Sequence, residues 1–168
     1  MAWREIALLR TIIKTQLTMP IQIDYSCPDD AFVQGIDVLT LLPHRSPFVM
    51  VGRMEHFDMQ SCTSSFIVSA DNAMVWHGAL SETGMLENVA QTCALRIGYL
   101  NRYIYSREVR PGYIGAIDRV VVHSLPRVGE RIETKVEVLA ELSGYIMVHA
   151  SVGTDDRVLL EADVRLAV

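Results

Sequence analysis

Apolar and polar residues alternate through residues 130–141, which is the pattern of a β-strand with one buried face. One face of this strand takes every second residue: Ile132, Thr134, Val136, Val138 and Ala140. The opposite face takes Arg131, Glu133, Lys135, Glu137 and Leu139. Three other runs, residues 112–123, 144–153 and 157–168, are also β-like and are joined by short turn-like links. The last third of the chain is therefore predicted to form four consecutive strands.

Residues 81–104 carry the one long helical pattern in the chain. Ser81 is a suitable N-cap for this helix, and Glu82 suits its first turn. Apolar residues occur on most of its sides: Met85, Leu86, Val89, Ala90, Cys93, Ala94, Ile97 and Leu100. A helix that is apolar nearly all round is buried, so we expect this one to lie inside the fold.

Shorter elements are predicted ahead of the long helix. Residues 48–59 and 63–70 have the composition of strands, and residues 35–42 are predicted to form a short helix that Pro43 ends. Strands, one long helix and then a run of strands indicate the α+β class rather than alternating β-α-β units. One antiparallel sheet wrapped around one central helix satisfies the whole pattern.

The chain of 168 residues is long enough for one domain, which we place at residues 35–168. Residues 1–34 are predicted to be a lead-in segment. Its first 18 residues have apolar side chains at helical spacing: Trp3, Ile6, Leu9, Ile13 and Leu17. Two interpretations of these 18 residues stay open, a short amphipathic packing helix or extra residues before a natural start at Met19.

Composition narrows the classes of function. The formal net charge is −5, which argues against nucleic acid as a partner. An acidic carrier protein would need a local basic patch on this surface. No apolar run approaches the roughly 20 residues that a membrane span needs. The three cysteines are widely spaced and form no metal-binding motif, so we expect reduced thiols in a cytoplasmic protein, with no metal and no cofactor.

Glu87 is the first candidate for chemistry, because it falls in the second turn of the predicted buried helix. A buried carboxylate is costly unless it is paired or hydrogen-bonded. Glu87 shares one helix stripe with Gln91, Ala94 and Gly98. The small residues of this stripe allow another element to approach closely, and Gln91 is placed to orient the carboxylate. The alternative is that the stripe is an exposed edge and Glu87 an ordinary surface acid.

Two histidines are the other candidates. His77 precedes the long helix by a few residues, and its imidazole can act as a base or an acid at neutral pH. It would stand near the free N–H groups of the helix start, which can polarise an oxygen atom. His44 lies between Pro43 and Pro47 in a stiff segment. For His44 we favour a structural role, hydrogen-bonding the local backbone.

Four segments, taken in order, resemble motifs of the β-hydroxyacyl-acyl carrier protein dehydratases, the FabZ- and FabA-like family. Residues 41–54, LLPHRSPFVMVGRM, resemble the family's LPHRxPFLLVDR, and residues 85–91, MLENVAQ, resemble its LIxEAMAQ helix motif. Residues 115–118 and 125–130 resemble its GID and PVxPGD segments. The resemblance covers roughly residues 35–168. Two departures stand out: WHGALSETG replaces the family's GHFPGxPxxPG, four residues shorter, and Gly52 replaces an Asp.

The resemblance implies the hot-dog fold, in which an antiparallel sheet wraps a central helix, and assembly from homodimers. It implies a lyase that dehydrates a 3-hydroxyacyl thioester on acyl carrier protein, or on coenzyme A, in fatty acid or specialised acyl biosynthesis. It also implies a catalytic pair from opposite protomers, which we assign to His77 and Glu87. We expect Gly78, Gly84 and Gln91 to contact the substrate.

In this mechanism His77 removes the proton from C2, and the helix N–H groups polarise the thioester carbonyl. Protonated Glu87 then helps the C3 hydroxyl to leave as water. Two alternatives stay open at this point. One is a hot-dog acyl thioesterase, in which Glu87 would activate water. The other is a non-catalytic acyl-binding subunit that partners another hot-dog protein, because the altered loop before the helix changes the thioester pocket.

Overall fold

The structure is a computed structural model that describes residues 23–109 and 113–167. The expectations for residues 1–18 lie outside the described residues. Six antiparallel strands form one curved sheet in the order β1-β2-β6-β7-β8-β5. Their bounds are β1 Arg53–Phe57, β2 Ser61–Ile67, β5 Tyr113–Val122, β6 Arg131–Leu142, β7 Tyr145–Gly153 and β8 Val158–Ala167.

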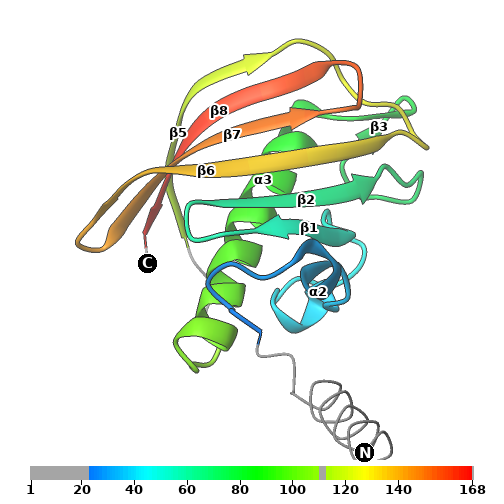
Figure 1. Ribbon diagram of the computed structural model, residues 1–168. Coiled ribbons are helices and arrows are strands. Elements are labelled where there is room, and N and C mark those ends of the chain that lie inside the picture. Colours follow the sequence, from blue (N-terminus) through cyan, green and yellow to red (C-terminus); the bar gives the residue numbers. More distant parts are fainter. Residues whose placement is uncertain (1–22, 110–112, 168) are drawn as a thin grey trace, which may run out of the picture.

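The long helix α3, Glu82–Tyr99, continues into a π-helical turn at Leu100–Ile104. The sheet curves around α3 (Figure 1), and the apolar inner faces of the strands meet the helix in one core. The prediction of an α+β hot-dog fold, with a single central helix, is confirmed. The helix spans nearly the residues that its apolar pattern indicated.

Strand β6 shows why the pattern of alternation predicted the sheet so well. Ile132, Thr134 and Val136 are almost completely buried, while the residues between them are exposed. In the register with β7, Thr134 faces Val152 and Val136 faces Ala150. Because side chains alternate across a strand, this register places one face of each strand on α3 and the other in solvent.

A buried polar contact fixes how α3 sits on the sheet. Asn88 is fully buried, and Thr134 of β6 donates a hydrogen bond to its Oδ1. Thr92, one turn further along α3, donates to the Asn88 carbonyl and shares a hydrogen bond of 2.7 Å with Ser64 of β2. Asn88, Thr92, Thr134 and Ser64 are therefore all paired, and these pairings specify one rotation of the helix against the strands.

The prediction of a short helix at 35–42 is wrong. The helix in this region is α2, Asp30–Gln34, and Gly35 ends it. Asp29 is the N-cap, because its carboxylate accepts a hydrogen bond of 2.7 Å from the Phe32 N–H. Asp29 and Asp30, which lie in the predicted lead-in segment, are the N-cap and the first residue of this helix. Only a 3-10 turn at Val38–Thr40 follows it.

The strand predicted at 48–59 is shorter in the structure, where β1 spans only Arg53–Phe57. Residues 48–50 run along α3, and their backbone groups bond to helix side chains in place of a neighbouring strand. The Met50 N–H donates to Gln91, and the Met50 carbonyl accepts from Asn88. This strap, residues 44–50, becomes important for the candidate site.

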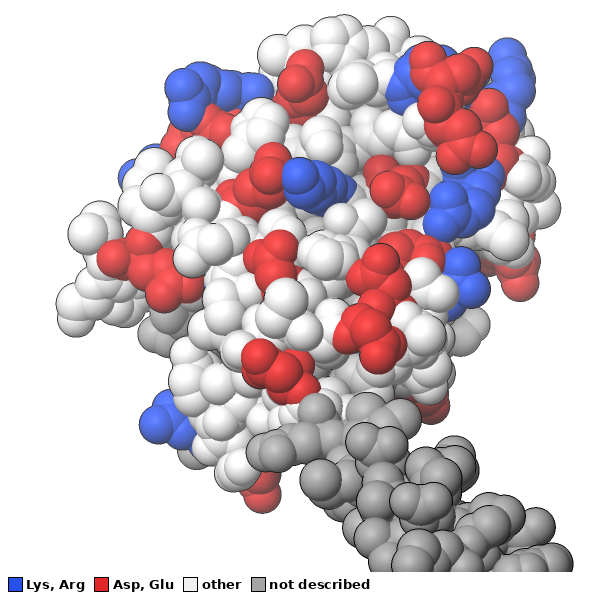
Figure 2. Space-filling model, in the orientation of Figure 1, with Lys and Arg blue, Asp and Glu red and all other residues white. Residues whose placement is uncertain are grey.

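The surface is mixed in charge on the face drawn in Figure 2. Acidic side chains are spread across this face, and the basic ones stand singly or in small groups, mostly toward its upper edges. The face therefore offers no extended basic patch for an acidic partner. Among the described residues, none of the helices has the length and apolarity needed to cross a membrane.

Candidate active site

Glu87 lies in the second turn of α3, at the rim of the face that the strap covers. Its side chain keeps 36% of its accessible surface. The prediction that this carboxylate is buried is therefore wrong for the single chain: the strap bonds to Asn88 and Gln91 and leaves the Glu87 side chain partly open to solvent. The alternative, an exposed helix stripe, is wrong as well: Gln91 is fully buried, and Gly98 packs against the backbone of Leu41.

Gln91 links the carboxylate to the strap through three hydrogen bonds. Its amide nitrogen donates to Glu87 Oε1 at 2.8 Å and to the Phe48 carbonyl at 2.7 Å. Its amide oxygen accepts from the Met50 N–H at 2.8 Å. The prediction that Gln91 orients Glu87 is confirmed. A direct contact between Gln91 and a substrate stays a prediction.

His77 lies at the tip of a small hairpin that the sequence did not predict, formed by β3, Val75–Trp76, and β4, Ala79–Leu80. His77 and Gly78 are the two turn residues, with φ of 49° and 76°. Positive φ at both positions is typical of a two-residue type I′ hairpin turn, and glycine adopts it freely. A His-Gly pair between two short apolar pairs was the available signal for this hairpin.

The hairpin is held by the turn at residues 126–129, which belongs to one of the recognised motifs. The Leu80 N–H donates to the Pro126 carbonyl at 2.9 Å, and the Val128 N–H donates to the Gly78 carbonyl at 3.0 Å. These bonds fix the hairpin tip, so the position of His77 is set by the fold.

The His77 side chain is exposed, and its ring packs edge-on against Trp76 at 4.8 Å. Trp76 is itself 74% exposed. Among the described residues, no ion pair or hydrogen bond joins His77 to Glu87; the histidine that faces Glu87 is His44. One chain therefore does not bring the two predicted catalytic residues into contact.

The start of α3 has the predicted cap. The Ser81 side chain accepts a hydrogen bond of 3.1 Å from the Gly84 N–H. Gly84 is buried, and a Cβ on it would lie 2.5 Å from Leu80 Cδ1 and 2.9 Å from Met74 Cβ. The hairpin therefore requires a glycine here for close packing. Its proposed contact with a substrate stays a prediction.

His44 is placed differently from our expectation. It does not hydrogen-bond the local backbone; Arg45 does, donating to the carbonyls of Leu42 at 2.9 Å and of His44 at 2.6 Å. The His44 ring instead faces α3, with Nε2 3.7 Å from Glu87 Oε1. The structural interpretation of His44 was wrong because nothing in the sequence shows that the strap folds back onto the helix at Glu87.

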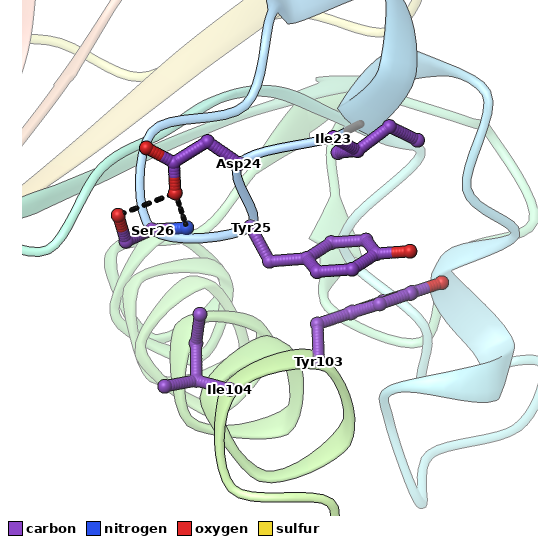
Figure 3. Close-up of a pocket in the computed structure, with 6 residues that line it drawn as sticks. All are labelled: Ile23, Asp24, Tyr25, Ser26, Tyr103 and Ile104. Carbon is purple, nitrogen blue, oxygen red and sulfur yellow. Dashed lines mark hydrogen bonds between the residues drawn. The ribbon is translucent and has the colours of Figure 1, made fainter. Parts of the chain in front are cut away.

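A separate hollow lies at the other end of α3 (Figure 3). Its walls include Asp24, Tyr25, Tyr103 and Ile104, and the Tyr25 and Tyr103 rings stack at 5.5 Å. Asp24 turns its carboxylate to the Ser26 backbone and hydroxyl. The candidate residues at the start of α3 do not line this hollow. Among the described residues, no group of His, Cys, Asp and Glu is arranged to hold a metal ion.

Comparisons with known proteins identify the family and the fold. The family model for ApeP-like proteins, described as ApeP dehydratase, matches residues 36–168. A relative named 3-hydroxyacyl-[acyl-carrier-protein] dehydratase FabZ, from Desulfotalea psychrophila, is 25% identical over 146 residues, covering 83% of this chain and 95% of the relative.

Solved structures extend the likeness of fold. A chain of the dehydratase heterocomplex ApeI:P from Xenorhabdus doucetiae superposes with a TM-score of 0.73 at 15% identity, covering 79% of this chain and 90% of that one. The thioesterase superfamily member 2 from zebra fish superposes with a TM-score of 0.59 at 12% identity, covering 75% of this chain and 87% of that one. The same fold therefore occurs in proteins named for two different reactions.

Proposed function

Because the chain belongs to the ApeP-like dehydratase family, we propose that it converts a 3-hydroxyacyl thioester, carried by acyl carrier protein or coenzyme A, to the 2-enoyl thioester. One observation carries this proposal: the Glu87 side chain is partly exposed on the central helix α3, and a hydrogen bond from the fully buried Gln91 holds it in place. A carboxyl group that is both oriented and reachable is suited to general acid catalysis.

The reaction needs one base and one acid. Neutral His77 takes the proton from C2, and the electron pair moves into the C2–C3 bond while the C3–O bond breaks. Protonated Glu87 gives its proton to the departing hydroxyl, which leaves as water. N–H groups at the start of α3, where Glu82 and Thr83 follow the Ser81 cap, polarise the thioester carbonyl. Exchange of protons with solvent then restores both side chains.

The proposed site needs two hot-dog chains. His77 and Glu87 do not meet within one chain, yet both are reachable from outside it. The sheet ends in β5, an edge strand whose side chains are largely exposed, with Tyr113 at 70% and Val121 at 48%. Such an edge favours pairing with another strand. A two-fold dimer would then bring His77 of one protomer to Glu87 of its partner.

A direct assay tests the reaction. The purified chain is given a 3-hydroxyacyl thioester of acyl carrier protein or of coenzyme A, and both enoyl product and free thiol are measured. We expect enoyl product without free thiol; free thiol alone would assign a thioesterase. Replacing His77 by Ala should lower the rate about 10²–10⁴-fold. The matched control is His123→Ala, which removes an exposed histidine that faces Glu161 on another part of the surface.

Subunit complementation tests the shared site. Equal amounts of the His77→Ala and Glu87→Gln chains are unfolded together and refolded. Half of the two-fold dimers are then mixed, and each mixed dimer holds one intact site, so roughly a quarter of all sites should recover. Verified mixed dimers without recovery would show that the two residues do not form one site across the interface.

The second candidate function is a non-catalytic subunit that binds acyl groups beside an active hot-dog partner. Two observations favour it: the shortened loop WHGALSETG before α3 and the likeness to a chain from a heterocomplex, ApeI:P. In that case the chain alone would give neither enoyl product nor free thiol. A mixture with a catalytic hot-dog partner would be active, and the His77→Ala exchange in this chain would leave that activity unchanged.

A further inference from the structure

The ring of His44 is held against Glu87 by the strap. Pro43 and Pro47 flank the histidine, and the Arg45 guanidinium bonds the backbone of the same loop. The His44 backbone is therefore tied locally, while its side chain points to α3 and places Nε2 3.7 Å from Glu87 Oε1. Both residues belong to one chain, so this contact does not depend on how the chains assemble.

The other nitrogen of the ring decides which tautomer His44 adopts. Nδ1 is buried, and no described residue forms a hydrogen bond with it. A proton on Nδ1 would be a buried donor without an acceptor, which is unfavourable. The neutral ring therefore carries its proton on Nε2, the nitrogen that faces Glu87. The same burial argues against His44 as the base, because taking up a second proton would place it on Nδ1.

Two N–H donors thus converge on one oxygen of the carboxylate. Gln91 already donates to Glu87 Oε1 at 2.8 Å, and His44 Nε2 lies 3.7 Å from the same atom. Among the described residues, Oε2 has no hydrogen-bond partner. The arrangement separates the two oxygens: Oε1 is held by the chain, and Oε2 is left for the substrate.

We propose that His44 is a positioning residue for Glu87, a neutral Nε2–H donor that stabilises the carboxylate formed when Glu87 gives its proton, through Oε2, to the leaving hydroxyl. This rests on the proposed dehydration. A distance of 3.7 Å is longer than a hydrogen bond, but catalytic hydrogen bonds tighten as charge develops. The donor therefore acts mainly in the transition state, which lowers the barrier without strengthening substrate binding.

Kinetics on two variants of His44 test the proposal. His44→Leu replaces the donor by an apolar side chain, whereas His44→Gln keeps an N–H donor. We expect kcat to fall roughly 10- to 100-fold in His44→Leu, less than for a dedicated oxyanion donor because Gln91 remains, with KM nearly unchanged and most of kcat restored in His44→Gln. Equal kcat in the wild type and His44→Leu, or an equal loss in both variants, would overturn the proposal. Thermal melting identifies a variant that merely fails to fold.

Complementation shows to which half of the site His44 belongs. His44→Leu mixed with His77→Ala should recover roughly a quarter of the sites, because His44 stands with Glu87 and apart from His77. His44→Leu mixed with Glu87→Gln should recover no fully active site and show only the residual activity of sites that carry the His44→Leu change. The reverse pattern would overturn the placement of His44. Failure of the His77→Ala and Glu87→Gln pair to complement would instead contradict the proposed two-chain site.

A readout without turnover keeps the two proposals separate. Ring ¹⁵N NMR of the wild-type chain, with the His44 signals assigned by their loss in His44→Leu, reports the tautomer directly. We expect the Nε2–H form at neutral pH, and a change in its Nε2 signal in the Glu87→Gln chain. The Nδ1–H form, or a signal that ignores the Glu87→Gln exchange, would sink the inference even if the protein proves to be a dehydratase.

Discussion

Replacing Gln91 by Leu should be among the most damaging single changes on α3. Leu has a similar volume but removes all three hydrogen bonds of the fully buried amide. The Met50 N–H is then left buried without a partner, which costs about 1–3 kcal/mol. The Phe48 carbonyl lies nearer to water, so its lost bond adds about 1 kcal/mol. Together the free energy of unfolding should fall by about 2–4 kcal/mol, a large share of the 5–15 kcal/mol typical of a domain.

Urea unfolding followed by circular dichroism measures this loss as a lower midpoint at nearly constant slope. The matched control is Gln60→Leu, the same exchange at an exposed position in the turn between β1 and β2, which should change stability by no more than about 0.5 kcal/mol. A loss below about 1 kcal/mol for Gln91→Leu would refute the reasoning, because it would mean that the strap does not depend on these bonds.

Three further predictions concern packing, pH and thiol chemistry. Gly98→Ala should lower the thermal midpoint by several degrees, since its Cβ would collide with the Leu41 carbonyl. The control is Gly115→Ala, whose Cβ meets nothing closer than 3.6 Å. Equal thermal midpoints for the two variants would contradict the steric argument. Hydrogen bonding to Asp30 first, and to Asp58, raises the pKa of His56 against the opposing effect of burial. The charged His56 therefore stabilises the fold below the ordinary histidine pKa of about 6.5, and this contribution is lost as pH rises through the raised pKa. His56→Gln should lower the urea midpoint more at about pH 5.5 than at about pH 8.5, and the effect is small because these side chains are partly exposed. The opposite pH trend would contradict this assignment. Burial raises the pKa of the Cys62 and Cys93 thiols, that of Cys93 to about 12, whereas Cys27 is exposed. A disulfide reagent should therefore label Cys27 quickly in the native chain and all three thiols after unfolding. A second rapidly labelled thiol, or rapid labelling of the Cys27→Ser chain, would contradict the burial of the other two cysteines.

The local sequence pattern was sufficient to predict the strand that buries one face and the helix that is buried on most of its sides. The strict alternation in 130–141 predicted β6, because a strand with one face on a core must repeat every two residues. The apolar run at 81–104 predicted α3 together with its Ser81 cap, because a helix apolar on most sides has to be covered. The spacing of Glu87 and Gln91 likewise predicted their hydrogen bond, since residues four apart on a helix are neighbours.

The rest of the site was decided by tertiary structure. His44 and Glu87 are 43 positions apart, and they meet only because the strap folds back onto α3, where Gln91 and Asn88 supply bonds that a strand would otherwise provide. A periodic pattern along the chain cannot predict this contact, because the contact depends on how two distant segments pack against each other. The same holds for the exposure of Glu87: the sequence correctly predicted a covered helix, but only the path of the strap left this carboxylate partly exposed.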